Sequence, residues 1–487
     1  MNLRDKKLKS VGRLTRKKGV IMKKIAKGVL ITVSAVMALS LVSCNKKGGA
    51  SKAAKNAPSY QGYTAEIDPS TGKVWDFGGM EVTIYDYWSN PDAPANSKTE
   101  EDQRAFRAWL EQTYNYKCVQ RDLAGWADHP KEITNFIMAG DTSKKVAYLV
   151  DGRSAISGVK NNFWYDVSKI KTVDFKSSKW NQAVGARLTV GKSQYGFRDI
   201  PSEPREGIFF NKRILEENGY DPDYIYDLQK KGKWTWDEFE KMCAKMTKDT
   251  DNDGVIDQYA MSSFYTSFGI ASIVSNGDAP VVVENGKYVE HFGTDKSMEA
   301  LNWAYNVYSK YQLPQGDGQW DYWLTAFING ETAFMCHQEY VAQPNGTLSS
   351  MKDDWGWACF PLGPKSNGKN FGIGDTQMMV IPSIYDDATA EKIAKIIDLY
   401  TTPVPGYDGP DSWKQMSYYQ GFRDERALEE TSYYMLNNTT ERIDSLIPDW
   451  SGEWMYNSIF HSWGKTPAET YEAEKGQIQA CLDNING

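Results

Sequence analysis

The chain has 487 residues, of which 41% are hydrophobic and 24% are charged. This composition is typical of a globular rather than a disordered protein, and the length exceeds one ordinary core, so two lobes are expected. Residues 1–43 hold 11 Lys or Arg and one acid, so a formal net charge of −7 leaves −17 for the remainder. A chain this acidic beyond its N-terminus is not expected to bind nucleic acid.

The N-terminal region has the pattern of an export signal. Residues 1–21 precede a better start and are interpreted as an upstream extension, whereas residues 22–43 join a basic stretch to an apolar run that ends at Leu41. That run is too short to span a bilayer comfortably. Leu41-Val42-Ser43-Cys44 resembles a bacterial lipobox, which implies cleavage before Cys44, acylation of its thiol and stable anchoring. The alternative is a chance Cys after an ordinary signal peptide.

Residues 44–75 are predicted to form a lipidated, flexible tether. Most of the segment is rich in Lys, Gly, Ala, Ser and Pro, which is typical of a linker rather than of a packed element. The folded body is therefore expected to be exported, to face away from the cytoplasm and to touch the cell membrane through its lipid anchor only.

The first part of the folded body alternates strands and helices. The patterns predict a strand at 81–88, a helix at 100–114, a helix around 133–137 that stops at Gly140, and a strand at 146–150. This order favours a mainly parallel α/β sheet, in which ligands bind beyond the carboxyl ends of the strands. The loops after Trp88 and Val150 are therefore placed at the candidate binding edge.

The second part continues with the same kinds of element. A strand at 208–210 precedes a helix that ends at Asn218-Gly219, and Thr235 has the pattern of an N-cap with Glu238 three residues on. Further helices are expected near 297–311, 388–400 and 469–484. The body shows no internal repeat and no transmembrane pattern.

The cysteines and histidines argue against several kinds of site. Five cysteines remain besides Cys44, and no two form a Cys-x-x-Cys pair, so neither a disulfide framework nor a zinc site is indicated. Buried free thiols are expected, with one chance disulfide as the alternative. The four histidines are scattered without a His-Glu-x-x-His motif, which argues against a zinc hydrolase.

Several short motifs recur in a characteristic order. They are Ile-Met-Ala-Gly-Asp at 137–141, Gly-Ile-Phe-Phe-Asn-Lys at 207–212, Lys-Trp-Thr-Trp-Asp-Glu-Phe at 233–239, Phe-Ile-Asn-Gly-Glu-Thr-Ala-Phe-Met at 327–335 and Phe-Gly-Ile-Gly at 371–374. Each motif is weak alone. In this order, over residues 80–400, they resemble the maltose-binding-like (family 1) extracellular solute-binding proteins of carbohydrate ABC importers.

The resemblance implies an α/β, two-lobed periplasmic-binding-protein-like fold with crossovers and a C-terminal helical segment. The expected N-lobe comprises residues 76–202 and 375–425, and the expected C-lobe comprises residues 203–374 and 426–487. The lobes are expected to close on the ligand like a hinge, and the closed form would be recognised by the permease. A monomer that needs neither a catalytic group nor a cofactor for its chemistry is expected.

The resemblance also carries over particular binding residues. Tyr340 stands where the family places an aromatic ring that stacks on sugar, with His337 and Glu339 beside it; a structural Tyr at a strand end is the alternative. Arg153 matches an Arg that donates to hydroxyl groups. Gly152 stands where the family has an Asp, and Asp151 is the candidate substitute.

Other candidates follow from their places in the predicted elements. They are Trp88 and Asn90 after the first strand, Glu203 and Arg205 before the first crossover, Trp320 and Trp323 before the helix near Phe327, and Asp375 on the return crossover. Core packing is the alternative for Trp88, and a packed helix face is the alternative for the Trp-x-x-Trp pair. Planar rings would cover the apolar faces of sugars, while carboxylates, Arg and amides would bind hydroxyls.

Residues 249–257, Asp-Thr-Asp-Asn-Asp-Gly-Val-Ile-Asp, follow the pattern of an EF-hand calcium loop. The candidate ligands are the carboxylates of Asp249, Asp251, Asp253 and Asp257 and the main chain of Val255. Ala260 replaces the usual bidentate Glu, and no second motif flanks the loop. A similar loop holds a structural calcium in long alginate-binding proteins of the same superfamily. A structural calcium is therefore suspected, with a solvated acidic turn as the alternative.

The predicted function is capture of an oligosaccharide outside the cell and its delivery to ABC transporter permease subunits. One alternative is a surface lipoprotein glycoside hydrolase or polysaccharide lyase, for which Glu203 and Glu206 could be posed as a carboxylate pair. The other alternative is a protein of the same fold that binds a peptide or another non-sugar solute.

Overall fold

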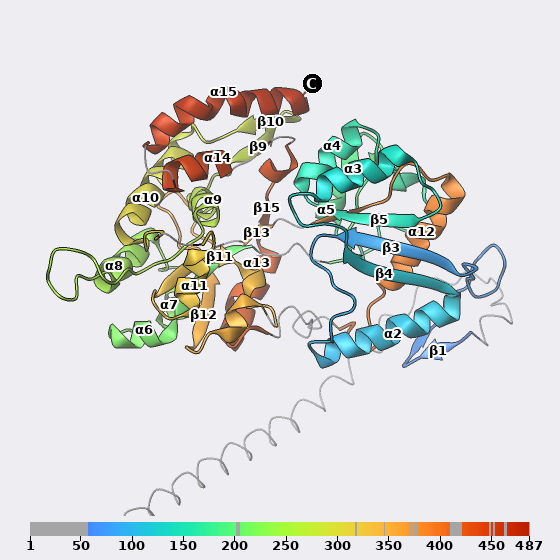
Figure 1. Ribbon diagram of the computed structural model, residues 1–487, viewed down its shortest axis with the longest axis horizontal. Helices are drawn as coiled ribbons and strands as arrows, with labels where there is room; N and C mark the ends of the chain where they lie inside the picture. The colour runs from blue at the N-terminus through green and yellow to red at the C-terminus, as the bar shows by residue number, and fades with distance from the viewer. Residues whose placement is uncertain are drawn as a thin grey trace, which may run out of the picture. The chain divides into compact units, whose positions relative to one another are not determined.

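The computed structural model describes residues 57–200, 205–316, 319–344, 346–370, 372–374, 377–409, 421–447, 450, 453–461 and 465–486. The chain divides into residues 1–56 and a compact unit of residues 57–487, and the description concerns the second unit (Figure 1). The predicted lipidation residue Cys44 and the site candidates Glu203 and Asp375 lie outside the described residues.

The N-lobe is built around a four-stranded, mainly parallel sheet, as the sequence predicts. Its order is β14 (Met378–Val380), β5 (Lys145–Val150), β3 (Met80–Asp86) and β4 (Tyr116–Asp122). β3 runs parallel to both neighbours, whereas β14 is antiparallel to β5. The carboxyl ends of β3, β4 and β5 therefore meet at one edge of the sheet.

Helices cover this sheet and close a single hydrophobic core. They are α2 (Lys98–Tyr114), α3 (His129–Ala139), α4 (Gly152–Lys160), α5 (Gln182–Arg187) and α12 (Asp387–Tyr400). α2 begins where the Ser97 side chain accepts the Glu100 N–H and ends at Asn115 in the left-handed region, and it buries Phe106 and Leu110. The core also takes in residues 378–381 and much of α12, so the chain returns to this lobe late in the sequence.

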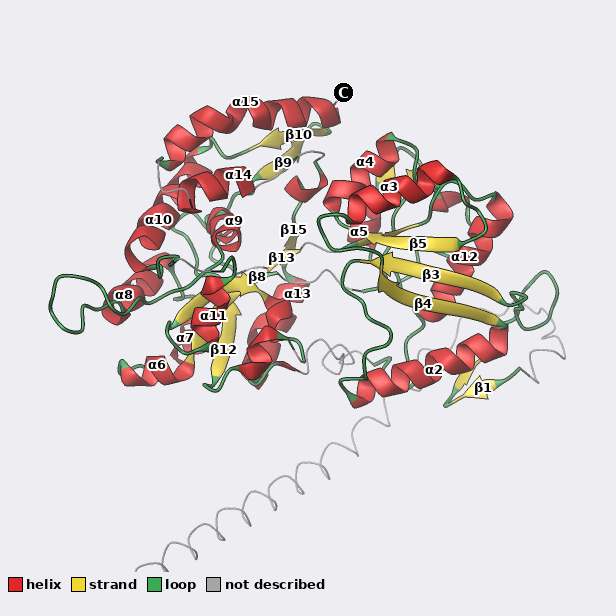
Figure 2. Cartoon of the chain, in the orientation of Figure 1, coloured by secondary structure: helices red, strands yellow, loops and turns green. Residues whose placement is uncertain are grey.

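The C-lobe has a separate sheet and a separate core (Figures 1 and 2). β8 (Glu206–Asn211) lies between β11 (Phe334–Gln338) and β12 (Trp355–Cys359) and is antiparallel to both. Every residue of β8 is buried, which explains its continuous apolar run instead of an alternating pattern. The surrounding helices are α6 (Lys212–Glu217), α7 (Tyr224–Lys230), α8 (Trp236–Met246), α9 (Tyr265–Ser275), α10 (Asp295–Tyr311), α11 (Tyr322–Ile328), α13 (Tyr433–Asn437), α14 (Glu453–Tyr456) and α15 (Pro467–Asn486).

Short strands complete the described structure. They are β1 (Ser59–Tyr60) with β2 (Tyr63–Thr64), β6 (Thr189–Val190) with β7 (Ser193–Gln194), β9 (Val281–Glu284) with β10 (Lys287–Glu290), and β13 (Gly372–Gly374) with β15 (Thr439–Glu441). The predicted N-cap of α8 is confirmed, because the Thr235 side chain accepts the Glu238 N–H at 3.4 Å. All five cysteines of the described part are free and buried.

The folded body begins at Ala57, within the segment 44–75 that is predicted to be a flexible tether. The β1–β2 hairpin lies within the predicted tether, yet Tyr60 packs against Phe106 and Trp109 of α2 with ring centroids 5.3 and 5.6 Å apart. Glu66 is held by an ion pair with Lys395 of α12 at 2.5 Å. The segment has the composition of a linker, but its tyrosines pack on a helix and keep it in the folded body. The predicted tether boundary at residue 75 is therefore wrong for the part from Ala57 onward.

The segments that cross between the two lobes are tied to one another by backbone hydrogen bonds. The Arg205 N–H donates to the Ile373 carbonyl at 2.9 Å, and the Arg442 N–H donates to the Gly374 carbonyl at 2.8 Å. The expected lobe boundaries differ from the observed cores at two places. Phe422 lies in the expected N-lobe segment but packs in the C-lobe core, and Leu446 lies in the expected C-lobe segment but packs in the N-lobe core.

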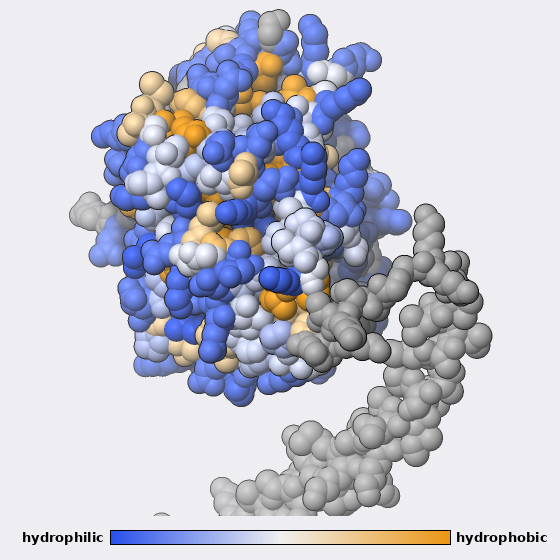
Figure 3. Space-filling model, turned by 90° about the vertical axis from the view of Figure 1, so that its right-hand side faces the viewer, coloured by the Kyte–Doolittle hydropathy of each residue, from blue (hydrophilic) through white to orange (hydrophobic). Residues whose placement is uncertain are grey.

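In the part of the chain that is described, the helices carry no membrane-spanning pattern. None of its helices is both long enough and apolar enough to cross a bilayer. The face drawn in Figure 3 is mostly hydrophilic, with hydrophobic residues in separate patches.

The excursion of residues 439–447 into the N-lobe explains an unusual glycine. A Cβ at Gly152, the first residue of α4, would lie 1.6 Å from the Ser445 carbonyl oxygen. Arg187 of α5 reinforces the contact, because it lies 3.3 Å from the Glu441 carboxylate and donates to the Arg442 carbonyl at 3.0 Å. The neighbouring backbone therefore occupies the space that any side chain at position 152 would need.

Replacing Gly152 tests this packing. Gly152→Ala is expected to lower the free energy of unfolding by about 1–3 kcal/mol, because the backbone at Ser445 must move to admit a methyl group. Urea denaturation of the purified protein measures the change. Gly476→Ala is the control: nothing lies within 4 Å of the added Cβ on α15, so stability should hold or rise. Equal stability of Gly152→Ala and the wild type would contradict the close contact.

Candidate functional site

The predicted binding edge of the N-lobe is formed by loops that follow three neighbouring strands. Trp88 and Asn90 follow β3, Trp126 follows β4, and Asp151 and Arg153 follow β5. Because these strands are parallel and adjacent, the five residues share one edge of the sheet. They are called the N-lobe edge below.

A buried carboxylate fixes the first of these loops. Asp86, the last residue of β3, accepts hydrogen bonds from the Trp88 and Ser89 N–H groups at 2.9 and 2.8 Å. Its second oxygen accepts from the Gln120 amide of β4 at 2.7 Å and from the Ser89 hydroxyl. A buried charge is tolerated when its oxygens are satisfied in this way, and here it joins the β3 loop to β4.

Trp88 does not pack in the core. It is 47% exposed and rests edge-on against Tyr87, with ring centroids 4.6 Å apart. The core alternative is therefore wrong for this residue. Asn90 is exposed, and its side-chain oxygen accepts the Asp92 N–H at 3.0 Å, so it shapes its own loop.

Arg153 and Asp151 form a fixed pair beneath a tryptophan that the sequence analysis missed. Asp151 caps α4, and the Arg153 Nε donates to its carboxylate at 2.8 Å. The guanidinium lies 3.7 Å from the centre of the Trp126 ring and also donates to the Trp126 carbonyl at 2.9 Å. Trp126 is 51% exposed. The pair therefore orients an indole whose remaining surface faces solvent.

The second group of predicted residues gathers in the C-lobe with two that were not predicted. It consists of Trp320, Trp323, His337 and Tyr340 together with Phe264 and Tyr265, and is called the C-lobe aromatic cluster. Phe264 is central: its ring centroid lies 5.2 Å from Trp323, 5.9 Å from His337 and 6.3 Å from Trp320.

The members of the C-lobe aromatic cluster divide by exposure. Trp320 and Tyr340 are 55% and 43% exposed, whereas Trp323 and His337 are buried. The packed-face alternative is therefore correct for Trp323 and wrong for Trp320. The buried rings support the exposed ones, and only the exposed ones can meet a ligand without rearrangement.

Arg205 and Glu339 lie where the crossing chain enters the C-lobe. Both are buried, their charged atoms are 4.0 Å apart, and the Glu339 N–H donates to the Arg205 carbonyl at 3.0 Å. Glu206 follows in β8 and is also buried, with one oxygen accepting from the Gln338 amide at 3.2 Å. These contacts fix the segment at the start of β8, where the chain enters the C-lobe sheet.

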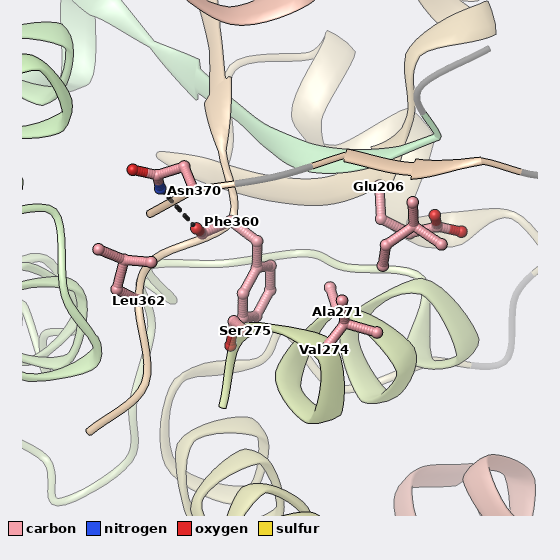
Figure 4. Close-up of a pocket in the computed structure, with 8 residues that line it drawn as sticks. Glu206, Ala271, Val274, Ser275, Phe360, Leu362 and Asn370 are labelled. Atoms are coloured by element: carbon pink, nitrogen blue, oxygen red, sulfur yellow. Dashed lines mark hydrogen bonds between the residues drawn. The ribbon is translucent and has the colours of Figure 1, made fainter. Parts of the chain in front are cut away.

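The C-lobe contains a small cavity near this entry. It measures about 10 Å³, which is about the space of one water molecule. It is lined by Glu206, Ala271, Val274, Ser275, Phe360, Leu362, Asn370 and Ile373, and the Asn370 amide donates to the Phe360 carbonyl at 3.4 Å (Figure 4). A sugar ring cannot fit there. A wider depression of about 420 Å³ between β10 and α15 contains none of the predicted binding residues.

The acidic loop brings some of its predicted calcium ligands together. Oxygens of Asp249, Asp251 and Asp257 lie within 4.8 Å of one another. The Asp249 carboxylate accepts the Asn252 and Gly254 N–H groups at 2.7 and 2.8 Å, with Gly254 at φ +91° as the tight turn requires.

The remaining loop positions fit calcium less completely. The Asp253 carboxylate accepts the Val255 N–H at 2.7 Å, and Ala260 is buried where an EF-hand has its bidentate Glu. Hydrogen bonds from Thr250 hold the pKa of the Asp257 carboxyl below its usual value, which keeps it ionised. The oxygen donors therefore suit a hard cation, with fewer protein ligands than an EF-hand offers.

Comparison with known proteins identifies one family and many solved structures that share the fold. The family model described as bacterial extracellular solute-binding protein matches residues 125–404. No curated protein sequence matches the chain.

Three solved structures illustrate the likeness. The ABC substrate-binding protein Lmo0181 from Listeria monocytogenes, in complex with cycloalternan, is 16% identical, with a TM-score of 0.56 over 84% of this chain and 98% of that chain. CpMnBP1 with mannotriose bound is 17% identical, with a TM-score of 0.57 over 83% and 100%. UgpB from Mycobacterium tuberculosis, in complex with glycerophosphocholine, is 14% identical, with a TM-score of 0.58 over 84% and 99%. At these identities the comparison establishes the fold.

The buried histidine of the C-lobe aromatic cluster generates a pH prediction. Burial lowers the pKa of His337 to about 4 from an ordinary value of 6.5. Above pH 6.5 the ring is neutral in both the folded and the unfolded chain. Between these two values only the unfolded chain binds the proton, so stability falls as the pH falls. The loss reaches about 3 kcal/mol near pH 4.

His337→Asn removes this titration while retaining a side-chain acceptor for the Gln338 N–H, which bonds His337 Nδ1 at 2.7 Å. We expect the wild type to lose more stability than the variant between pH 6.5 and pH 4, measured by denaturation at each pH. Carboxylates titrate in both proteins and cancel in the difference. Parallel pH profiles of the two proteins would contradict the buried neutral imidazole.

Proposed function

The chain belongs to the bacterial extracellular solute-binding proteins, and from this premise we propose that it captures an oligosaccharide between its two lobes and delivers it to ABC transporter permease subunits. The observation that carries the proposal is the exposure of aromatic rings on both lobes. Trp88 and Trp126 are exposed at the N-lobe edge, and Trp320 and Tyr340 are exposed in the C-lobe aromatic cluster. Large rings are normally buried, so their exposure at the ligand edge needs a reason.

Carbohydrate is the ligand chemistry that best matches these groups. A pyranose ring presents an apolar C–H face to an aromatic ring and hydroxyls around its edge. At the N-lobe edge, Arg153 supplies donors beside the indole of Trp126, and its orientation is fixed by Asp151. Structures of the same fold support this class, since Lmo0181 is in complex with cycloalternan and CpMnBP1 has mannotriose bound.

Capture and release require the lobes to move about the crossing segments. The lobes have separate hydrophobic cores, and the chain crosses from one to the other near the backbone hydrogen bonds from Arg205 to Ile373 and from Arg442 to Gly374. Such an arrangement allows closure by changes in a few backbone torsions while each core stays intact. The closed form would then present the surface that the permease recognises.

A non-sugar solute is the second candidate, because the fold also serves other ligands. UgpB, which is in complex with glycerophosphocholine, has a TM-score of 0.58 to this chain, similar to those of the carbohydrate-bound relatives. The exposed tryptophans favour a sugar over such a small polar solute.

Ligand screening by thermal stability tests the function. A glycan that binds only the folded protein is expected to raise the Tm, and Trp320→Ala is expected to weaken its binding about tenfold through loss of stacking. Tyr433→Ala is the control, since it removes an exposed ring from α13 outside the C-lobe aromatic cluster. A Tm rise with glycerophosphocholine or peptides and with no glycan would overturn the carbohydrate assignment.

Lipid anchoring is proposed from the sequence around Cys44, which resembles a lipobox. The acylated Cys would keep the exported protein at the cell membrane, with residues from 45 onward as its tether. Cys44→Ser is expected to abolish fatty-acid labelling and to shift the protein from the membrane fraction to the soluble fraction. Labelling that persists in the variant would place the lipid elsewhere, and absence of label from the wild type would rule lipidation out.

A structural calcium in the acidic loop is proposed from the gathered oxygens of Asp249, Asp251 and Asp257. The ion would neutralise the repulsion among the carboxylates and stiffen the loop after α8, with no part in ligand chemistry. EDTA is expected to lower the Tm and calcium to restore it, by about 2 °C or more.

The double variant Asp251→Asn/Asp257→Asn is expected to lose the calcium response. Asp141→Asn, an exposed carboxylate that accepts bonds from Ser143 in another loop, is the matched control. A wild-type Tm that is indifferent to EDTA would identify the loop as a plain acidic turn.

A further inference from the structure

The two exposed tryptophans of the N-lobe edge occupy neighbouring loops that are tied together. β3 and β4 are adjacent and parallel, so Trp88 and Trp126 follow the ends of paired strands. The Asp122 N–H donates to the Ser89 carbonyl at 2.8 Å, and the Leu123 N–H donates to the Asp86 carbonyl at 2.9 Å. The loops therefore move as one piece, and we call Trp88 and Trp126 the N-lobe platform.

Each ring of the N-lobe platform is oriented before any ligand arrives. Trp88 has its main chain bonded to the buried Asp86 and its ring against Tyr87. Trp126 has one face covered by the Arg153 guanidinium at 3.7 Å, and Asp151 fixes that guanidinium. Rings held in this way lose little conformational entropy on binding, which favours their use as stacking surfaces.

The charges around the N-lobe platform disfavour an anionic ligand. The guanidinium of Arg153 is already neutralised by Asp151 at 2.7 Å. Asp122 at the end of β4 and Asp128 before α3 are exposed carboxylates, and the described residues supply no ion pair to either. A uronate or sulfate would therefore approach unpaired negative charge. The cation beside Asp122, Arg121, is paired with Asp92 of the loop after β3 at 3.4 Å.

Resting on the proposed function, we propose that the N-lobe platform stacks on two rings of a neutral oligosaccharide and disfavours acidic glycans. Two separate indoles cover the apolar faces of two sugar rings, so binding requires at least a disaccharide unit. The donors of Arg153 bind hydroxyl oxygens beside Trp126, and the carboxylates of Asp122 and Asp128 accept hydroxyl protons or repel acid groups. This assigns Trp126, through its stacking face, a role in specificity.

Calorimetry with defined glycans tests the platform. The probes are glucose, and neutral tetrasaccharides of β-glucan, β-mannan, α-glucan and xylan, set against tetramannuronate and tetragalacturonate. At least one neutral tetrasaccharide is expected to bind, glucose far more weakly, and the acidic tetrasaccharides at least about a hundredfold more weakly. The double variant Asp122→Asn/Asp128→Asn is expected to reduce the difference in affinity between acidic and neutral tetrasaccharides. Added salt should reduce the same difference.

Variants of the platform complete the test. Trp126→Ala and Trp88→Ala are each expected to weaken the neutral ligand about tenfold, whereas Trp126→Phe restores most of the affinity. Met138→Ala is the control, an exposed apolar side chain on α3 of the same lobe, and should bind as the wild type. Denaturation curves show whether each variant is folded.

The outcomes separate this inference from the function on which it rests. Tighter binding of an acidic than of a neutral tetrasaccharide would overturn the charge argument and leave carbohydrate capture standing. Neutral binding that is unaffected by both Trp→Ala variants would overturn the platform and again leave the function standing. Failure of every glycan, with a rise in Tm for another solute, would overturn both.

Discussion

The structure depends on the way one chain is shared between two hydrophobic cores. Residues 439–447 leave the C-lobe, place Leu446 in the N-lobe core and return, and they press so closely on α4 that Gly152 admits no side chain. Backbone hydrogen bonds, such as the one from the Arg442 N–H to the Gly374 carbonyl, hold this segment beside β13. The cores stay separate, so a ligand can draw the lobes together without unpacking either one.

The candidate site follows one principle in both lobes: buried groups orient exposed rings. Asp86 and the Asp151–Arg153 pair fix the two tryptophans at the N-lobe edge, and Phe264 supports Trp320 in the C-lobe. The chain has 17 Trp and 29 Tyr, and this division gives such residues two structural roles. Buried and exposed rings are both present, and the buried rings pack against the exposed ones.

Local patterns predicted most elements, and long-range packing decided the rest. The strand expected at 81–88 is observed as Met80–Asp86, and it and the cap at Thr235 depend on neighbouring residues, so their sequences suffice. β4 was missed because Lys117, Gln120 and Arg121 hide an edge strand, and Trp126 was missed with it. α9 was missed because every residue is buried and no helical period remains, which concealed Phe264 and Tyr265. The need for a glycine at position 152 comes from the Ser445 carbonyl, which is distant in the sequence, so no local pattern could predict it.

The hairpin at the start of the folded body also determines where force enters the molecule. Tyr60 is clamped on α2, and Glu66 is paired with Lys395, which Asp398 also holds at 2.7 Å on α12. A pull along the chain from its N-terminus therefore reaches the N-lobe core first. The crossing segments lie outside that path of mechanical strain. A force applied to the segment before Ala57 would therefore reorient the folded body without separating its lobes.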